Sequence, residues 1–155
     1  MRKLDRVDRK ILAILQEDAS LAVAEVASRV GLSPTPCWRR IQRLRTDGVI
    51  ERTVALVKPE AIGFGLTVFM EIEARDHSPE WLEQFTRAVV QRGEVLEVHR
   101  MAGDIDYLLR VAVPDMAAFD AFYRDLIAAV PLKNVSSHFA MERVKDTTAY
   151  PVRVE

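Results

Sequence analysis

The sequence has only one cysteine and no hydrophobic run long enough to span a bilayer, and both features limit the class of protein to which it can belong. One cysteine, Cys37, excludes an internal disulfide framework and is typical of a protein from a reducing compartment. A membrane-spanning helix needs about 20 consecutive apolar residues, and the first residues lack the apolar stretch of a secretory signal. The protein is therefore expected to be cytoplasmic, with no membrane partner.

The sequence also has little that indicates catalysis. Its histidines, His77, His99 and His138, lie more than twenty residues apart, and Cys37 is distant from all of them. No spacing suggests a Ser/His/Asp or Cys/His arrangement, a glycine-rich phosphate loop or a cluster of metal ligands. We therefore expect a protein that is not an enzyme and that has no metal site and no cofactor.

The net charge of −1 conceals an uneven distribution along the chain. Residues 1–60 contain 12 Lys and Arg against 8 Asp and Glu, whereas residues 61–155 contain 10 against 15. A polyanionic partner such as double-stranded DNA is therefore expected to bind the N-terminal third.

Residues 1–57 have the pattern of a winged helix-turn-helix. Apolar residues recur at helical spacing, and Gly31 suits the left-handed position that follows a helix. Ser33 and Pro36 are typical of a helix start. Two helices, a glycine turn and a final basic helix are the order of elements in DNA-binding helix-turn-helix domains. The expected elements are helices at about 5–17, 23–30 and 35–47, followed by a wing-like strand at 49–57.

The third of these helices is expected to carry the DNA-binding side chains. Cys37 falls on the apolar side and is expected to pack as a small hydrophobe rather than to act in redox sensing. Trp38 is expected to cover the same core, although an aromatic side chain beside DNA can also touch a thymine methyl group. The alternative for the arginines opposite is a solvated basic face. The candidate contacts to bases or phosphates are Ser33, Thr35, Pro36, Arg39, Arg40 and Arg43.

Residues 66–155 have the alternating pattern of a second domain, after a linker at 58–65 that contains proline and glycine. The order strand-helix-strand-strand-helix-strand predicts a ferredoxin-like βαββαβ domain, so the fold class is α+β. Apolar residues on both sides of the first strand predict that the sheet packs on a second copy in a homodimer. Residues 142–155 form a tail that can add a short edge strand. The expected elements are strands at 66–72, 95–101, 107–113 and 135–141 and helices at about 78–92 and 115–130.

These features together resemble the Lrp/AsnC (leucine-responsive, feast/famine) family of prokaryotic transcription regulators, along essentially the whole chain. In addition, the cysteine-responsive branch of that family is resembled at Trp38, at residues 101–103 and at residues 136–142. The segments that carry the family resemblance are 4–12, 31–44 with its Ser-Pro-Thr-Pro-Cys opening, 47–50 and 103–107.

The resemblance implies that the second domain senses an amino acid, dimerises and assembles further, for example into octamers. Effectors of the family bind between ferredoxin-like domains near the turn that joins the second and third strands, here residues 101–106. Gly103 can leave backbone N–H groups open to a carboxylate, and Asp104 or Asp106 can accept from an ammonium group. The alternatives are a plain hairpin with solvated acids and an exposed or internally paired His138. The candidate effector-binding residues are Met101, Gly103, Asp104, Asp106, Ser136 and His138.

The expected function is therefore a sequence-specific DNA-binding transcription regulator. A small amino acid, with cysteine as one candidate, is expected to change its DNA binding or its assembly. The alternative is an architectural DNA-binding protein that responds to no ligand.

Overall fold

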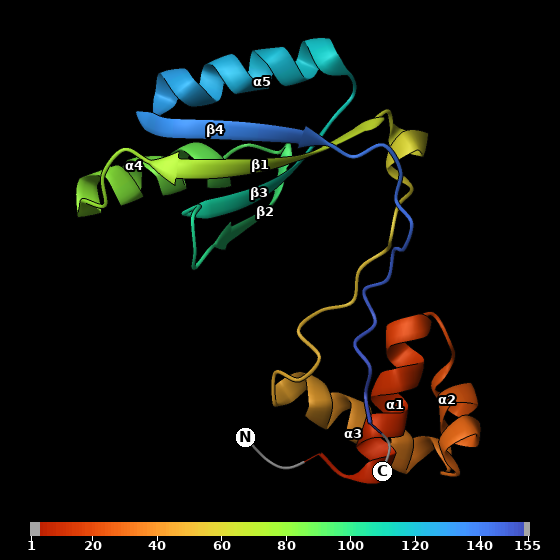
Figure 1. Ribbon diagram of the computed structural model, residues 1–155. Helices are drawn as coiled ribbons and strands as arrows, with labels where there is room; N and C mark the ends of the chain where they lie inside the picture. The colour runs from red at the N-terminus through yellow and green to blue at the C-terminus, as the bar shows by residue number, and fades with distance from the viewer. Residues whose placement is uncertain (1–3, 154–155) are drawn as a thin grey trace. The chain divides into compact units, whose positions relative to one another are not determined.

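The computed structural model describes residues 4–153, which form two compact units (Figure 1). The helical unit contains the described residues up to 56 and those from 145 onward. The sheet unit is Val57–Val144. Residues 145–153 therefore belong with the helical unit, whereas the sequence assigned them to the ferredoxin-like domain.

The helical unit is built around α1 (Arg6–Glu17), α2 (Val23–Val30) and α3 (Pro34–Thr46). Helix α1 begins at Asp5, whose carboxylate accepts the backbone N–H of Asp8 in a capping box. Helix α2 ends at Gly31, which has a φ of 74° that favours glycine. One apolar stripe from each helix meets in a shared core. The buried core residues are Ile11, Leu12, Val26, Ala27, Val30, Cys37, Ile41 and Leu44.

The predicted wing-like strand at 49–57 is not formed. None of these residues belongs to a strand, and Val54, Leu56 and Val57 expose more than half of their surface. A strand needs a partner for its backbone groups, and the strands that the structure describes all belong to the sheet unit. The chain then makes a short 3-10 turn, η1 (Pro59–Ile62), inside the predicted linker.

The sheet unit has the predicted βαββαβ order. Its four strands form one antiparallel sheet with the order β2-β3-β1-β4, which is the ferredoxin-like arrangement. The strands are β1 (Leu66–Ala74), β2 (Val95–Arg100), β3 (Tyr107–Val113) and β4 (Leu132–Phe139), and the helices are α4 (Pro79–Val90) and α5 (Met116–Ala129).

Both helices of the sheet unit pack on the same face of the sheet. Helix α4 contributes Trp81 and Phe85, whose rings stack with centroids 5.0 Å apart, and Phe85 lies 4.5 Å from the ring centroid of Tyr107 on β3. The Trp81 indole Nε1 donates to the Pro131 carbonyl at 2.6 Å, so its buried polar group is satisfied. Helix α5 contributes Phe119, Phe122 and Leu126 to the same core.

The opposite face of the sheet, here called the open face, is covered by no element of the sheet unit. Its central residue is Phe69 on β1, which is 39% exposed and lies between Arg110 on β3 and His138 on β4. The same face carries the half-buried Leu108. Apolar side chains among paired charges at the centre of an uncovered face are unusual for a surface that faces water alone.

The C-terminal segment, residues 145–153, does not add an edge strand to the sheet. It contains no strand, and Val152 packs against the core of the helical unit. The side-chain amide of Gln16 on α1 also bonds the backbone of Tyr150. These contacts supply the segment with the partners that an edge strand would have found on β4, and Figure 1 shows the segment returning to α1.

Candidate nucleic-acid interface and effector turn

Helix α3 presents four lengthwise strips of side chains, because its period is 3.6 residues. The core strip is buried in the helical unit. One flanking strip contains Arg40 and Arg43 and contacts the start of α1. The other flanking strip contains Trp38 and Arg45. The strip opposite the core, here called the outward face, consists of Thr35, Arg39, Gln42 and Thr46.

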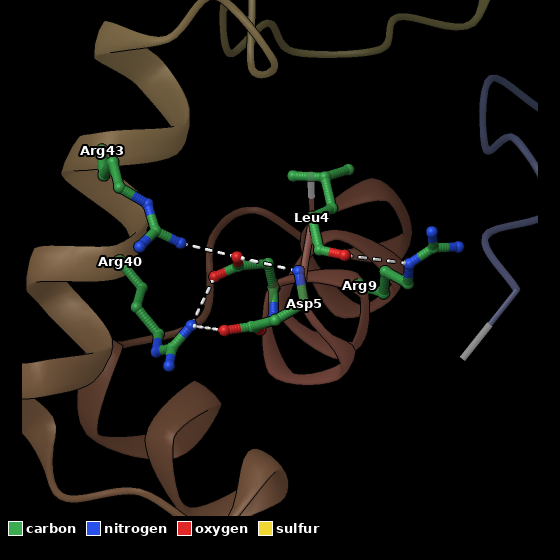
Figure 2. A network of polar contacts seen from close by, with 6 residues as sticks. Leu4, Asp5, Arg9, Arg40 and Arg43 are labelled. Carbon is green, nitrogen blue, oxygen red and sulfur yellow. Dashed lines mark hydrogen bonds and ion pairs between the residues drawn. The ribbon is translucent and has the colours of Figure 1, made fainter. Parts of the chain in front are cut away.

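Arg40 and Arg43 are held in an ion-pair network with α1 (Figure 2). The Arg40 Nη1 donates to Asp5 Oδ2 at 2.5 Å and to Asp8 Oδ1 at 2.8 Å. The Arg43 Nη2 donates to Asp8 Oδ2 at 2.6 Å. Asp8 is only 2% exposed, and a carboxylate this deep requires such partners. These two arginines therefore join α3 to α1 within the fold, besides any contact that they make with DNA.

The charges of this network support one another. The backbone N–H of Asp8, followed by the Arg40 guanidinium, holds the pKa of Asp5 below its ordinary value. Hydrogen bonds to Asp5 and then to Asp8 raise the pKa of Arg40. Nearby Cys37 is fully buried, and burial raises the pKa of its thiol, so it is held as the neutral core residue that the sequence predicts.

The outward face of α3 is free of the network. Thr35, Arg39 and Thr46 are exposed and Gln42 is half-buried. Within residues 4–153, no hydrogen bond or ion pair engages the side chain of Arg39 or that of Gln42. Among the three candidate arginines Arg39, Arg40 and Arg43, Arg39 is therefore the one whose guanidinium is fully available to a partner.

Trp38 does not cover the core, which corrects the expectation from sequence. It is 51% exposed, whereas its neighbour Cys37 is completely buried. Its position lies about 60° farther round the helix than that of Ile41, which is enough to turn a large ring away from the small core. The protein therefore displays an indole beside the outward face.

The start of α3 offers few backbone donors. Ser33 is its N-cap residue but makes no side-chain capping bond, and both Pro34 and Pro36 lack an N–H group. Among the first three helical positions only Thr35 has a backbone N–H. The hydroxyl groups of Ser33 and Thr35 are consequently the main polar groups at this helix end.

The partners of Arg40 and Arg43 are the residues that sequence reasoning missed. Asp8 lies three and four residues before Ile11 and Leu12, so it falls on the buried stripe of α1. A carboxylate on an apolar stripe needs a cation, and Asp5 and Asp8 share the three-residue spacing of Arg40 and Arg43. That matching spacing was the available signal.

The predicted effector turn, residues 101–106, joins β2 to β3. Asp106 is bound into the fold: its Oδ2 accepts the Ala74 N–H at 2.7 Å, and its own N–H donates to the Ile72 carbonyl at 2.9 Å. His77 Nε2 lies 3.7 Å from the other carboxylate oxygen. The Asp106 carboxylate therefore fixes the turn to the end of β1.

The tip of the same turn is open. Met101, Gly103 and Asp104 are exposed, and Gly103 has a φ of 132°, a conformation that side chains rarely allow. Ser136 and His138 lie on β4, beyond β1 from this turn, and His138 Nε2 is 3.7 Å from Glu71 Oε2. The structure thus brings the turn residues together but places the two β4 residues elsewhere on the sheet.

Family models match both units of the chain. The AsnC-type helix-turn-helix domain matches residues 4–45. The Lrp/AsnC ligand binding domain matches residues 67–150, which is more than half of the chain. The chain belongs to the Lrp/AsnC family. Within this family it is a DNA-binding transcription regulator with a ligand-binding domain, so the sheet unit is here called the ligand-binding unit, and α3 is the last helix of the helix-turn-helix domain.

Several relatives share this organisation along nearly their whole length. The chain is 49% identical to the DNA-binding transcriptional activator DecR of Escherichia coli over 96% of this chain and 99% of that protein. It is 38% identical to the leucine-responsive regulatory protein of the same organism, over 98% and 93%. These relatives are named as transcription regulators, which agrees with the expectation of no enzyme.

Solved structures give the same fold. An AsnC family transcriptional regulator from Agrobacterium tumefaciens is 57% identical and superposes with a TM-score of 0.92, over 96% of this chain and 97% of that one. A transcriptional regulator from Neisseria meningitidis in complex with L-Met is 36% identical, with the same TM-score and the same coverage. None of the helices in residues 4–153 is long and apolar enough to cross a membrane.

Replacing Asp8 tests the ion-pair network. Asp8→Ala is expected to lower the free energy of unfolding by about 2 kcal/mol, because Arg40 and Arg43 lose a buried acceptor while remaining partly solvated. Urea denaturation followed by circular dichroism measures the change. Asp47→Ala removes an exposed carboxylate at the C-terminal end of α3, the helix that carries Arg40 and Arg43, and is the matched control. Equal stability of the two variants would contradict a structural role for Asp8.

Proposed function

We propose that the protein is an effector-controlled transcription regulator that binds promoter DNA through the outward face of α3 and a small amino acid at the ligand-binding unit. The observation that carries this proposal is the difference in contacts among the candidate arginines of α3. Arg40 and Arg43 are held by Asp8, whereas Arg39 projects from the opposite side of the buried strip.

The outward face suits the major groove of DNA. In helix-turn-helix domains the N-terminal part of the recognition helix contacts base edges. Arg39 can donate two hydrogen bonds to guanine O6 and N7, and Gln42 can pair with adenine N6 and N7. Trp38 offers an apolar surface to a thymine methyl group or a sugar.

The remaining candidates suit the phosphate backbone. Ser33 and Thr35 present hydroxyl groups at the start of α3, and Pro36 lies beside them with its ring exposed. Arg40 and Arg43 retain N–H groups that Asp5 and Asp8 do not use, and these are directed to phosphates at the edge of the interface. In this arrangement Arg39 and Gln42 supply specificity, and the other residues supply position.

The effector proposal rests on the family and on the geometry of the turn at 101–106. A relative that is 36% identical along the whole chain binds L-Met, which supports an amino acid as the ligand. Asp104 is the acid in this turn that faces solvent, since Asp106 is bound to β1. We assign Asp104 to the ammonium group of the effector and the backbone beside Gly103 to its carboxylate. Ser136 and His138 reach the ligand only where two ligand-binding units meet, and cysteine remains a candidate ligand with methionine.

The assembly that we propose is a homodimer, able to associate further, in which two sheets pack through their open faces. The half-exposed Phe69 at the centre of this face supports that choice. A dimer also places two recognition helices on a two-fold axis, which matches palindromic half-sites. An effector bound between ligand-binding units then changes the assembly or the placement of the helices.

Replacing Arg39 tests the outward face. With DNA selected from a random pool by the wild-type protein, Arg39→Ala is expected to weaken binding about tenfold to a hundredfold and to relax base preference at one position. Fluorescence anisotropy measures the Kd at fixed salt. Arg124→Ala, an exposed arginine of α5, is the control. Wild-type affinity and specificity in Arg39→Ala would overturn the assignment.

An amino-acid screen tests the effector. Calorimetry with each proteinogenic amino acid is expected to find at least one that binds, and Asp104→Ala should lose that binding because the ammonium group loses its acceptor. Asp120→Ala, which removes an exposed acid from α5, should bind normally. Absence of heat from every amino acid would favour the ligand-independent architectural protein.

A charge at the centre of the open face tests the dimer. Phe69→Glu is expected to convert a dimeric or larger species into a monomer in sedimentation velocity, since it replaces an apolar contact with two carboxylates that face each other across the two-fold axis. Leu82→Glu changes a residue of similar exposure on the helix side and should leave the assembly intact. A monomeric wild-type protein would refute this part of the proposal.

A further inference from the structure

The C-terminal segment contacts the helical unit, mainly α1, although more than 130 residues separate the two in sequence. The Gln16 amide forms a closed pair with Tyr150: its Oε1 accepts the Tyr150 N–H at 2.8 Å, and its Nε2 donates to the Tyr150 carbonyl at 3.1 Å. The Arg9 guanidinium donates to the Arg153 carbonyl at 2.9 Å. Val152, between them, packs on the core of the helical unit. Backbone, side chain and apolar contacts thus all hold the segment.

These contacts define an extended segment that runs antiparallel to α1. From Tyr150 to Arg153 an extended chain covers about 10 Å. From Gln16 back to Arg9 the helix covers about 10.5 Å. Arg9 and Gln16 are seven residues apart and therefore lie on one face of α1. The match of length and direction makes this face a docking surface for an extended peptide.

The two chain connections between the units leave the ligand-binding unit at one end of its sheet. Thr67 at the start of β1 accepts the N–H of Ala140, just after β4, at 3.0 Å. The linker before β1 and the C-terminal segment after β4 therefore begin side by side. The effector turn is attached to the other end of β1 through Ile72 and Ala74. Strand β1 thus spans from the effector turn to the point where both connections start.

Helix α1 in turn holds the recognition helix. Asp8 lies one residue before Arg9, and its carboxylate bonds Arg40 and Arg43 of α3. A displacement of α1 by the C-terminal segment therefore reaches α3 through the ion pairs that the buried Asp8 carboxylate makes with two partly exposed arginines. Between Ala140 and the contacts of Tyr150, the connection is the exposed chain of residues 141–148.

We propose that this face of α1 is a docking surface for the C-terminal segment of the same chain, and that the docked segment transmits the effector state of the ligand-binding unit to the recognition helix. The linker at 58–65 connects the two units only through the covalent chain after α3. The C-terminal segment adds a second connection, from the end of β4 to α1. The coupling role rests on the effector control proposed above, whereas the docking itself does not.

Cross-linking tests the docking independently of any effector. Glu17→Cys and Tyr150→Cys, in a Cys37→Ala background, place thiols beside the docking contacts without removing Gln16 or the Tyr150 backbone. A short bismaleimide is expected to join them within one chain, which denaturing gels show as a monomer with altered mobility. A cross-linked dimer would overturn the same-chain assignment, and the absence of any cross-link would overturn the docking.

Gln16→Ala tests the coupling, because it removes both bonds to Tyr150. The variant is expected to bind the effector with wild-type affinity in calorimetry, while the effector changes its DNA Kd by less than about twofold, against the fivefold or larger change typical of allosteric regulators in the wild type. Gln84→Ala is the matched control and should respond normally, since it removes a hydrogen bond from a glutamine side-chain amide to the Ala129 carbonyl within the ligand-binding unit. Val152→Asp is a second variant that should behave like Gln16→Ala.

The outcomes are distinguishable. An undiminished effector response in Gln16→Ala and Val152→Asp would overturn the coupling. Restoration of the response in Gln16→Ala by the Glu17–Tyr150 cross-link would support it, since the cross-link replaces the lost bonds. If no amino acid changes DNA binding by the wild type, the effector control fails and the coupling fails with it, but the cross-link still decides the docking.

Discussion

The carboxylate of Asp8 is the point on which the DNA-binding unit depends. It is buried beside the N-terminal end of α1 and accepts from two arginines of α3, so the angle between these helices is set by charge as well as by packing. A buried pair adds little net stability compared with an apolar contact, but breaking it is costly. The consequence is that the orientation of α3 follows that of α1, with Arg39 exposed on the side opposite the core.

The ligand-binding unit is organised around β1 in a comparable way. This strand pairs with β3 on one side and β4 on the other, and it carries core residues on one face and Phe69 on the other. One end is bonded to the turn at 101–106, and the other lies at the start of both connections to the helical unit. A single strand therefore touches the core, the open face and the effector turn.

Most of the fold could be predicted from the sequence, because local signals agreed with tertiary needs. Gly31 after the second helix and Ser33 and Pro36 at the start of the third fixed helix boundaries to within a residue or two. The wing at 49–57 was predicted from β propensity and partial alternation and is not formed, since neither signal supplies a pairing partner.

The site was less predictable for reasons that lie in long-range contacts. Charge and spacing identified α3, but they could not show that Asp8 would hold Arg40 and Arg43, because the partners are more than thirty residues apart. Likewise, the sequence predicted that Trp38 covers the core, but its position about 60° farther round the helix than Ile41 leaves the ring outside. The C-terminal segment has a docking surface that no local pattern reveals.

The positions of the two tryptophans have an optical consequence. Trp38, in the helical unit, is half exposed to water, whereas Trp81, in the ligand-binding unit, is 4% exposed and stacked on Phe85. An indole in water emits at longer wavelength than one in an apolar core, and soluble quenchers reach it more readily. The protein thus contains one tryptophan in each unit, and their emission separates events beside α3 from those in the core of the ligand-binding unit without any added label.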